Sequence, residues 1–301
     1  MATLLVHAVE QGLAFGIAAL GVFLTYRVLK FPDLTVDGSF VTGAAIASLL
    51  LVRTGIDPFS VLLIAFAAGC VAGVITGLLN TRLGITNLLA GVLTMIMLYS
   101  INLRIMGRPN LSLLRVDTAT RLIDQVWSPL GSVSVLIFIA LLTFGIKFLL
   151  DLFLRTEVGF ALRATGDSET MITAQGVDTK RMKVLGLALS NGLVALSGAL
   201  VAQYSGFADI GMGIGMIVTG LAAVIIGGTL IRSSRVGWMT LSVLVGSLIY
   251  RIAVTLALRY GHVVGFQASD LKLITAILVV LALVLPRIRE QRQRKVSACS
   301  G

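Results

Sequence analysis

The chain has 301 residues, of which 57% are hydrophobic and only 13% are charged. Its mean hydropathy is +0.99, and its apolar content exceeds the roughly 45–50% of an ordinary soluble domain. Lys and Arg number 24 against 14 Asp and Glu, which in a membrane protein is typical of basic cytoplasmic loops. Nucleic-acid binding is not expected, because the basic residues are scattered between apolar runs without an aromatic platform.

Apolar runs of about the length of a membrane span follow one another along the whole chain and predict a single membrane domain over residues 1–301. The run Gly38–Val52 is short for a hydrocarbon layer of about 30 Å, so we expect a broken or tilted helix there. About nine spans are predicted, at Leu4–Leu29, Gly38–Val52, Pro58–Asn80, Asn87–Ile105, Val133–Phe153, Val184–Tyr204, Gly213–Ile231, Val236–Leu258 and Leu271–Leu285.

Most basic residues of the short loops fall on one side if these spans alternate, and that side is predicted to be the cytoplasm. The loop 155–183 and the basic tail 287–301 carry most of this charge, which places the N-terminus outside. Four arginines on the other side argue mildly against this orientation: Arg104, Arg108, Arg115 and Arg121.

Glycines recur at every fourth position, at 12 and 16 and again at 69, 73 and 77. In lipid this spacing lets helix backbones approach closely, and packing within one subunit is favoured over a dimer face.

Two segments of the chain resemble each other. Phe31–Leu34 followed by Val41–Gly43 is echoed by Phe207–Ile210 followed by Val218–Gly220. With alternating spans the two copies would run in opposite directions across the membrane, which predicts two related, inverted helix sets.

The chain carries no recognisable catalytic motif. It has no Gly-rich phosphate loop ending in Lys-Ser/Thr, no zinc-ligand spacing of His and Glu, and only two isolated cysteines, Cys70 and Cys299. We therefore expect no enzyme activity, no metal and no cofactor, with any ATP hydrolysis in a separate chain.

Charged groups within a membrane cost about 2.5–3.5 kcal/mol each at a helix centre, so they are candidates for function. Arg251 lies well inside a predicted span. It could bind a substrate carboxylate, or it could have a structural role and hold Asp209 or a helix C-terminus in place. Lys147 and Asp151 are four residues apart and are expected to pair with each other. Breaks between helices are predicted at Asp33–Gly38 and at Asp209–Gly213, in the two similar segments, and are expected to face the translocation pathway. The candidate pathway residues are Asp33, Thr35, Asp37, Asp209 and Arg251.

The longest polar segment, 155–183, contains a short predicted helix bracketed by Gly166 and Gly176. Acidic residues suit its N-terminus and Gly176 suits a left-handed C-terminal cap. It is too short to span a membrane, and it is either a solvated loop helix or a docking element for a soluble partner. Its candidate coupling residues are Asp167, Ser168, Glu169, Met171, Ile172, Ala174, Gln175 and Gly176.

Nearly the whole chain resembles a known family. The segments Gly159–Gly166, Gly176–Val177 and Leu185–Ala202 resemble the coupling loop of ATP-binding-cassette (ABC) permeases of the branched-chain amino acid and ribose type. The segments Phe31–Phe40 and Asn102–Asn110 are similar to one subgroup, the uncharacterised permeases of a tryptophan/tyrosine type.

The resemblance implies an all-α, type II-like importer permease with two related helix sets, located in the bacterial inner membrane as a homodimer. Its partners would be cytoplasmic ABC ATPase subunits and an extracytoplasmic solute-binding protein, and its solute a small molecule such as an amino acid. Related permeases often have ten spans and a cytoplasmic N-terminus, so the nine predicted here depart from the family by one helix. The alternatives are a secondary transporter, which also uses inverted repeats and broken helices, and a membrane enzyme or scaffold.

Overall fold

The computed structural model describes residues 2–126, 133–231, 233, 235–261, 276 and 280. Within them, seven helical segments are long and apolar enough to cross a membrane, by length and composition. The first segment joins α1 to a π-helical turn, η1. The spanning helices are α1 (Ala2–Phe23) with η1 (Leu24–Val28), α2 (Thr35–Thr54), α3 (Pro58–Thr81), α4 (Asn87–Met106), α6 (Ser134–Arg155), α9 (Thr179–Ser205) and α11 (Val236–Gly261).

Seven of the nine predicted spans thus appear as long helices. The predicted span Gly213–Ile231 is instead a helix of 15 residues, α10 (Met216–Leu230). The predicted span Leu271–Leu285 lies outside the described residues, apart from Ala276 and Val280. Of the broken or tilted helix expected at Gly38–Val52, the break is contradicted, because α2 is a continuous helix of 20 residues that already begins at Thr35.

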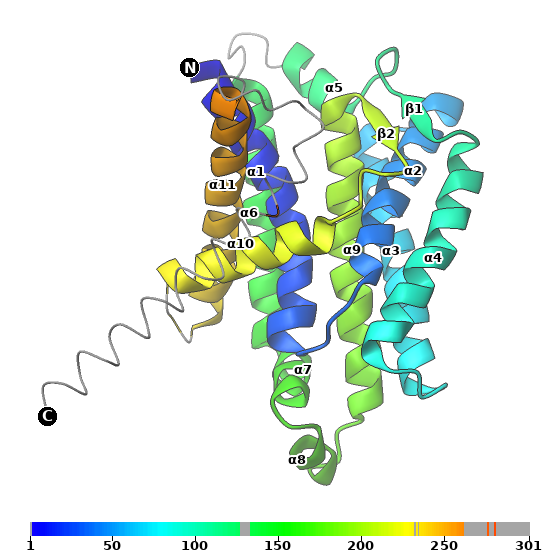
Figure 1. Ribbon diagram of the computed structural model, residues 1–301, viewed down its shortest axis with the longest axis vertical. Coiled ribbons are helices and arrows are strands. Elements are labelled where there is room, and N and C mark those ends of the chain that lie inside the picture. The colour runs from blue at the N-terminus through cyan, green and yellow to red at the C-terminus, as the bar shows by residue number, and fades with distance from the viewer. Residues whose placement is uncertain are drawn as a thin grey trace, which may run out of the picture.

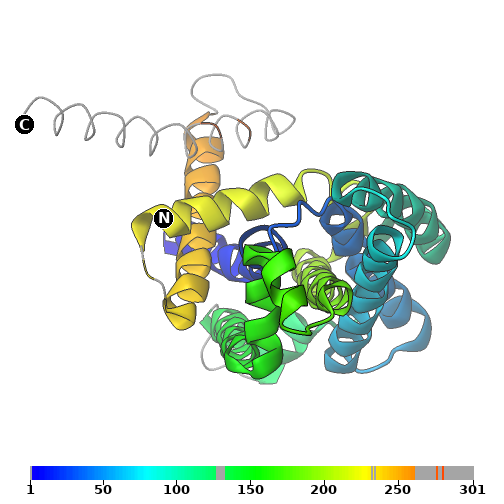
Figure 2. The same ribbon diagram turned by 90° about the horizontal axis from the view of Figure 1, so that it is seen from below.

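The helices form one bundle with two distinct ends (Figure 1). One end carries the short helices α7 (Glu157–Asp167) and α8 (Glu169–Ala174) and is called the α8 end below. The other carries the N-terminus, α5 (Ala119–Val126) and two short strands, and is called the β end. Seen from the α8 end, α9 lies in the interior of the bundle (Figure 2), where it packs against α1, α2 and α3.

Small residues bring α3 and α9 into close contact. A Cβ atom added at Gly69, Gly73 or Gly77 would collide with the backbone of α9 around Asn191, Leu187 and Val184 respectively. The sequence prediction of close packing within one subunit is therefore confirmed for this glycine series. The same holds for Gly12 and Gly16 of α1, which face Leu248 and Leu244 of α11.

The β end is closed by a two-stranded antiparallel ribbon of β1 (Asn110–Ser112) and β2 (Phe207–Asp209), in which Asn110 lies opposite Asp209. Gly206 makes the turn possible between α9 and β2, because it adopts a φ of 78°, which side-chain-bearing residues avoid. No strand was predicted at either segment of this ribbon.

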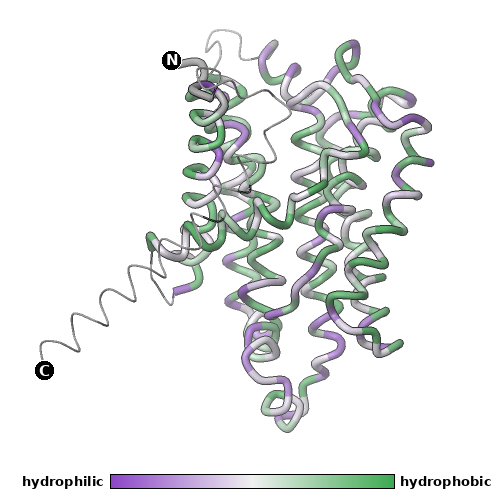
Figure 3. The backbone as a smooth tube through the Cα atoms, in the orientation of Figure 1, coloured by the Kyte–Doolittle hydropathy of each residue, from purple (hydrophilic) through white to green (hydrophobic). Residues whose placement is uncertain are grey.

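Apolar residues cover the middle of the helices, and polar residues gather toward the ends (Figure 3). Large apolar side chains on α3, α4 and α6 are exposed, among them Leu63 (70%), Ile96 (58%) and Leu141 (71%). Such an exposed apolar surface suits contact with lipid or with another membrane subunit.

Candidate functional site

The first break in the bundle lies between η1 and α2, at residues 29–34. Its Asp33 carboxylate is 2% exposed and accepts hydrogen bonds from Asn191 Nδ2 at 2.7 Å and from the Thr35 backbone N–H at 2.9 Å. The Thr35 hydroxyl lies 2.7 Å from that of Thr76 on α3. Asp33 and Thr35 are thus enclosed by α2, α3 and α9, which satisfies a carboxylate and a hydroxyl that would be costly to bury alone.

The second break is the loop of residues 210–215, between β2 and α10. It meets the first break at the side chain of Asp37, in the first turn of α2. Its carboxylate accepts hydrogen bonds from the backbone N–H groups of Gly215 at 2.9 Å and Ile217 at 2.8 Å. These groups belong to the N-terminus of α10, where free N–H groups and the helix dipole favour an anion. A carboxylate from α2 therefore caps α10 across the bundle.

Asp209 lies apart from these groups, in β2 at the β end. Its side chain accepts hydrogen bonds from the Gly211 backbone N–H at 2.8 Å and from Asn110 Nδ2 at 3.4 Å. These contacts hold the turn after β2 and join it to β1.

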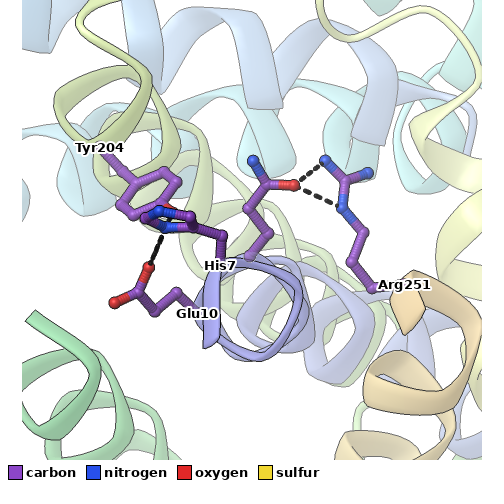
Figure 4. A network of polar contacts seen from close by, with 5 residues as sticks. His7, Glu10, Tyr204 and Arg251 are labelled. Carbon is purple, nitrogen blue, oxygen red and sulfur yellow. Dashed lines mark hydrogen bonds and ion pairs between the residues drawn. The ribbon is translucent and has the colours of Figure 1, made fainter. Parts of the chain in front are cut away.

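Arg251 of α11 bonds to α1 and to no carboxylate among the described residues. Its Nε and Nη2 donate to Gln11 Oε1 at 2.9 and 2.6 Å (Figure 4). The guanidinium also lies over the Phe15 ring, 4.6 Å from the centroid. The expected alternative partners, Asp209 or a helix C-terminus, are therefore replaced by a neutral amide and an aromatic face.

A cavity of about 420 Å³ opens beside Arg251, between α1, α10, α11 and the loop that precedes α10. Its walls include Phe15, Met216, Thr219, Ser247 and Arg251. A second cavity, of about 410 Å³, is lined by Asp37, Tyr99, Asn102, Ile210 and Ile214, among others. Ile214 lines both cavities, so the loop before α10 lies between them.

A polar cluster that the sequence analysis missed joins α1 to α9 near the β end. The Tyr204 hydroxyl donates to Glu10 Oε2 at 2.8 Å, and His7 Nδ1 lies 2.9 Å from the same oxygen (Figure 4). The spacing of three residues between His7 and Glu10 on one helix was a signal for half of the cluster, whereas Tyr204 is remote in sequence.

The polar segment 155–183 forms two helices instead of the single predicted one. Gly166 lies within α7, where it touches the Val28 backbone, so it packs against the first break and does not bracket α8. Asp167 is the last residue of α7, and α8 begins after Ser168, whose hydroxyl caps the Met171 backbone N–H at 3.4 Å. The expectation that Asp167 starts the coupling helix was therefore wrong, because Thr156 caps an earlier helix, its hydroxyl accepting from the Gly159 backbone N–H at 3.2 Å.

The end of α8 follows the prediction more closely. Gly176 adopts a left-handed φ of 87° just after α8 and Gln175. Ile172 is 7% exposed, whereas Met171 is 60% exposed. One apolar side chain thus anchors α8 to its own subunit while the other faces outward.

Ion pairs connect this segment to the rest of the α8 end. Lys30 Nζ lies 2.9 Å from Asp167 Oδ1, and Lys183 Nζ lies 2.6 Å from Glu169 Oε1. The Lys30 hydrogen bond and charge hold the pKa of the Asp167 carboxyl below its ordinary value of 3.8. On α6, the predicted pair of Lys147 and Asp151 is confirmed at 2.6 Å.

The chain matches the family described as branched-chain amino acid transport system / permease component, over residues 4–284. It is 42% identical to a tyrosine transport system permease protein of Clostridioides difficile, over 92% of this chain and 89% of that protein. It is 35% identical to uncharacterized protein RP368 of Rickettsia prowazekii, over 93% and 96% of the two chains. A fructose import permease protein, FruG of Bifidobacterium longum, is 27% identical over 83% of this chain and 74% of that protein.

No solved structure matches the chain significantly. A family match over residues 4–284 nevertheless agrees with the helical, multi-pass architecture and with the coupling-loop resemblance. The chain belongs to the ABC importer permease family of branched-chain amino acid transport systems, and is a multi-pass membrane transport subunit of a bacterial transport system.

Proposed function

We propose that the chain works as a homodimeric permease with two cytoplasmic ATPase subunits and an extracytoplasmic binding protein, and that it imports an amino acid. Support for an amino acid comes from the 42% identical relative, whose name specifies tyrosine. The ATPase would supply energy and the binding protein would deliver the solute, since this chain has no phosphate-binding loop of its own.

The α8 end is the proposed cytoplasmic end. The segments that close this end are η1 with the loop before α2, the turn after α3 and segment 155–183 (Figure 1). They carry Arg27, Lys30, Arg82 and the basic residues of segment 155–183, and basic segments of this kind face the cytoplasm in most membrane proteins. This orientation places α7 and α8 where a soluble ATPase could reach them.

The proposed ATPase contact is the outer face of α8, and the exposure of Met171 carries this proposal. A 60% exposed methionine on a helix of six residues has no lipid to enter at the tip of the bundle. The buried side chain of Ile172 anchors α8 to the rest of the chain, and the ion pair between Lys183 and Glu169 holds it further. A rigidly held apolar side chain that projects into solvent suits insertion into a groove of a partner.

The proposed route for the solute runs along the second break. Arg251 lines one cavity, Asp37 lines the other, and the loop after Asp209 separates them. Asp33 and Thr35 would not contact the solute; their hydrogen bonds would fix the start of α2 and so the position of the route. ATPase closure would move α8, and α7 would pass the movement to the first break through the Gly166 and Lys30 contacts.

Substitution of Met171 tests the coupling role. Met171→Asp would place a charge in the proposed groove, where it would be buried without a partner, so ATPase association and uptake should both be lost. Co-purification of the ATPase with the permease measures the first, and uptake by intact cells measures the second. Met171→Leu, which keeps an apolar side chain, and the distant Thr179→Ala should both retain them.

Full uptake by Met171→Asp with the ATPase still bound would make α8 a solvated loop helix. Uptake by cells that lack the ATPase altogether would favour the alternative of a secondary transporter.

A further inference from the structure

The cavity beside Arg251 combines a cation that no described carboxylate compensates with a largely apolar wall. Arg251 belongs to a membrane-spanning helix, and the acceptor that it contacts, Gln11 Oε1, is neutral. No Asp or Glu among the described residues lies within ion-pair distance of its guanidinium. A charge in a membrane protein is normally paired or faces a water-filled route, so the cavity side of this guanidinium is suited to an anion from outside the protein.

The other anion-binding group beside the cavity is already occupied. Gly215 and Met216, at the N-terminus of α10, also line the cavity, but the α10 N-terminus is capped by the Asp37 carboxylate. Among the described residues that line this cavity, Arg251 is therefore the group left to bind an anion, and its planar fork suits the two oxygens of a carboxylate.

The cavity also offers acceptors that a cationic amine needs. The Ser247 hydroxyl donates its proton to Gly12 O at 2.8 Å, and the Thr219 hydroxyl donates to Met216 O at 2.8 Å. Since each hydroxyl proton is already used, each oxygen presents lone pairs to a donor. Both residues line the cavity together with Arg251.

Most of the other described residues that line the cavity are apolar, and Tyr250 adds an aromatic ring with a hydroxyl. Phe15, Ile214, Met216 and Val218 face the same space, and its volume of about 420 Å³ lies within the roughly 300–1,000 Å³ of small-molecule sites. Phe15 contributes twice, because it lines the cavity and stacks under the guanidinium at 4.6 Å. A ligand side chain could therefore be apolar or aromatic.

We propose that this cavity is an intramembrane binding site for the zwitterion of an α-amino acid, with Arg251 binding the carboxylate and the Ser247 and Thr219 oxygens accepting from the ammonium. The inference deepens the proposed function, on which it rests for the transported solute. It also gives the permease a selectivity of its own, since a neutral sugar has no group that can compensate the Arg251 charge.

Ligand-observed saturation-transfer NMR on the full-length permease in lipid nanodiscs tests the site without ATPase or binding protein. The probes are L-tyrosine, tyramine, which lacks only the carboxylate, and fructose. We expect transfer to L-tyrosine at least tenfold above that to tyramine or fructose. Equal transfer to L-tyrosine and tyramine, or no transfer to L-tyrosine, would overturn the proposal, and this comparison needs no variant.

Variants then locate the site. Arg251→Gln should reduce the L-tyrosine signal at least tenfold, and Arg251→Lys should restore part of it because it keeps the charge. Arg259→Gln removes an exposed arginine from the same helix and should leave the signal unchanged. An unchanged signal in Arg251→Gln would contradict the assignment. Loss of ATPase association would bear on the proposed function alone, because no ATPase takes part in this measurement.

Discussion

The break before α2 and the break before α10 both start a helix within the bundle, but they are held by different contacts. At the first break, Asp33 is 2% exposed and hydrogen-bonded to Asn191 and Thr35. At the second, the loop after Asp209 borders two cavities, and the N-terminus of α10 depends on the side chain of Asp37 from another helix. The first break is therefore suited to be an anchor, and the second to change shape when Asp37 moves.

The largest expected effect comes from removing the anchor. Asp33→Leu leaves the Asn191 amide and the Thr35 N–H without their acceptor, and each buried donor left unsatisfied costs about 1–3 kcal/mol. We expect a clear drop in the thermal unfolding midpoint of the purified protein in detergent. Asp209→Leu, at the matching position of the second break, is the control and should cost much less. Equal losses in the two variants would contradict the distinction between the breaks.

A smaller effect is expected when the second break loses its cap. Asp37→Leu removes the acceptor for the Gly215 and Ile217 N–H groups, and loss of a helix cap costs about 0.5–2 kcal/mol. Hydrogen exchange should therefore speed up at these two amides and remain slow in the first break. Asp37→Asn keeps an acceptor oxygen and should show a weaker change. If both amides stay protected in Asp37→Leu, the cap does not control the start of α10.

The smallest effect concerns the outer end of the first break, where Lys30 pairs with Asp167. The folded-state pKa of Asp167 lies below 3.8, so the stabilisation by this pair is present above that value and is lost as the pH falls through the lowered pKa. In Lys30→Met the pKa of Asp167 should rise toward its ordinary value, as a carbon-13 NMR titration of the carboxyl group would show. An unchanged pKa would mean that Lys30 does not hold Asp167 in solution, where exposed pairs are weak.

Local sequence patterns predicted the parts of the fold that depend on neighbouring residues. Apolar length located the long helices, the spacing of Gly69, Gly73 and Gly77 predicted their contact, and Gly176 marked the end of α8. The pair of Lys147 and Asp151 followed from their spacing on one helix.

Contacts between residues remote in sequence could not be predicted in this way. α2 already begins at Thr35, whose hydroxyl lies 2.7 Å from that of Thr76 and whose backbone N–H donates to Asp33. Apolar length alone began this span at Gly38. Asp37 accepts hydrogen bonds from the amides of Gly215 and Ile217, which lie 178 and 180 residues further along the chain. Within the candidate site, the sequence singled out Asp33 and Arg251 as candidates by their charge. It could not predict that Asp33 is enclosed while Arg251 borders a cavity.

Reconstituted transport shows whether uptake by the permease is coupled to ATP hydrolysis. Proteoliposomes would contain the permease with its ATPase subunits, and uptake of radiolabelled L-tyrosine would be followed after adding the binding protein. We expect uptake to require both ATP and the binding protein, and to continue when ion gradients are collapsed. Uptake that is driven by a proton or sodium gradient in vesicles without the ATPase would contradict ATP-driven import.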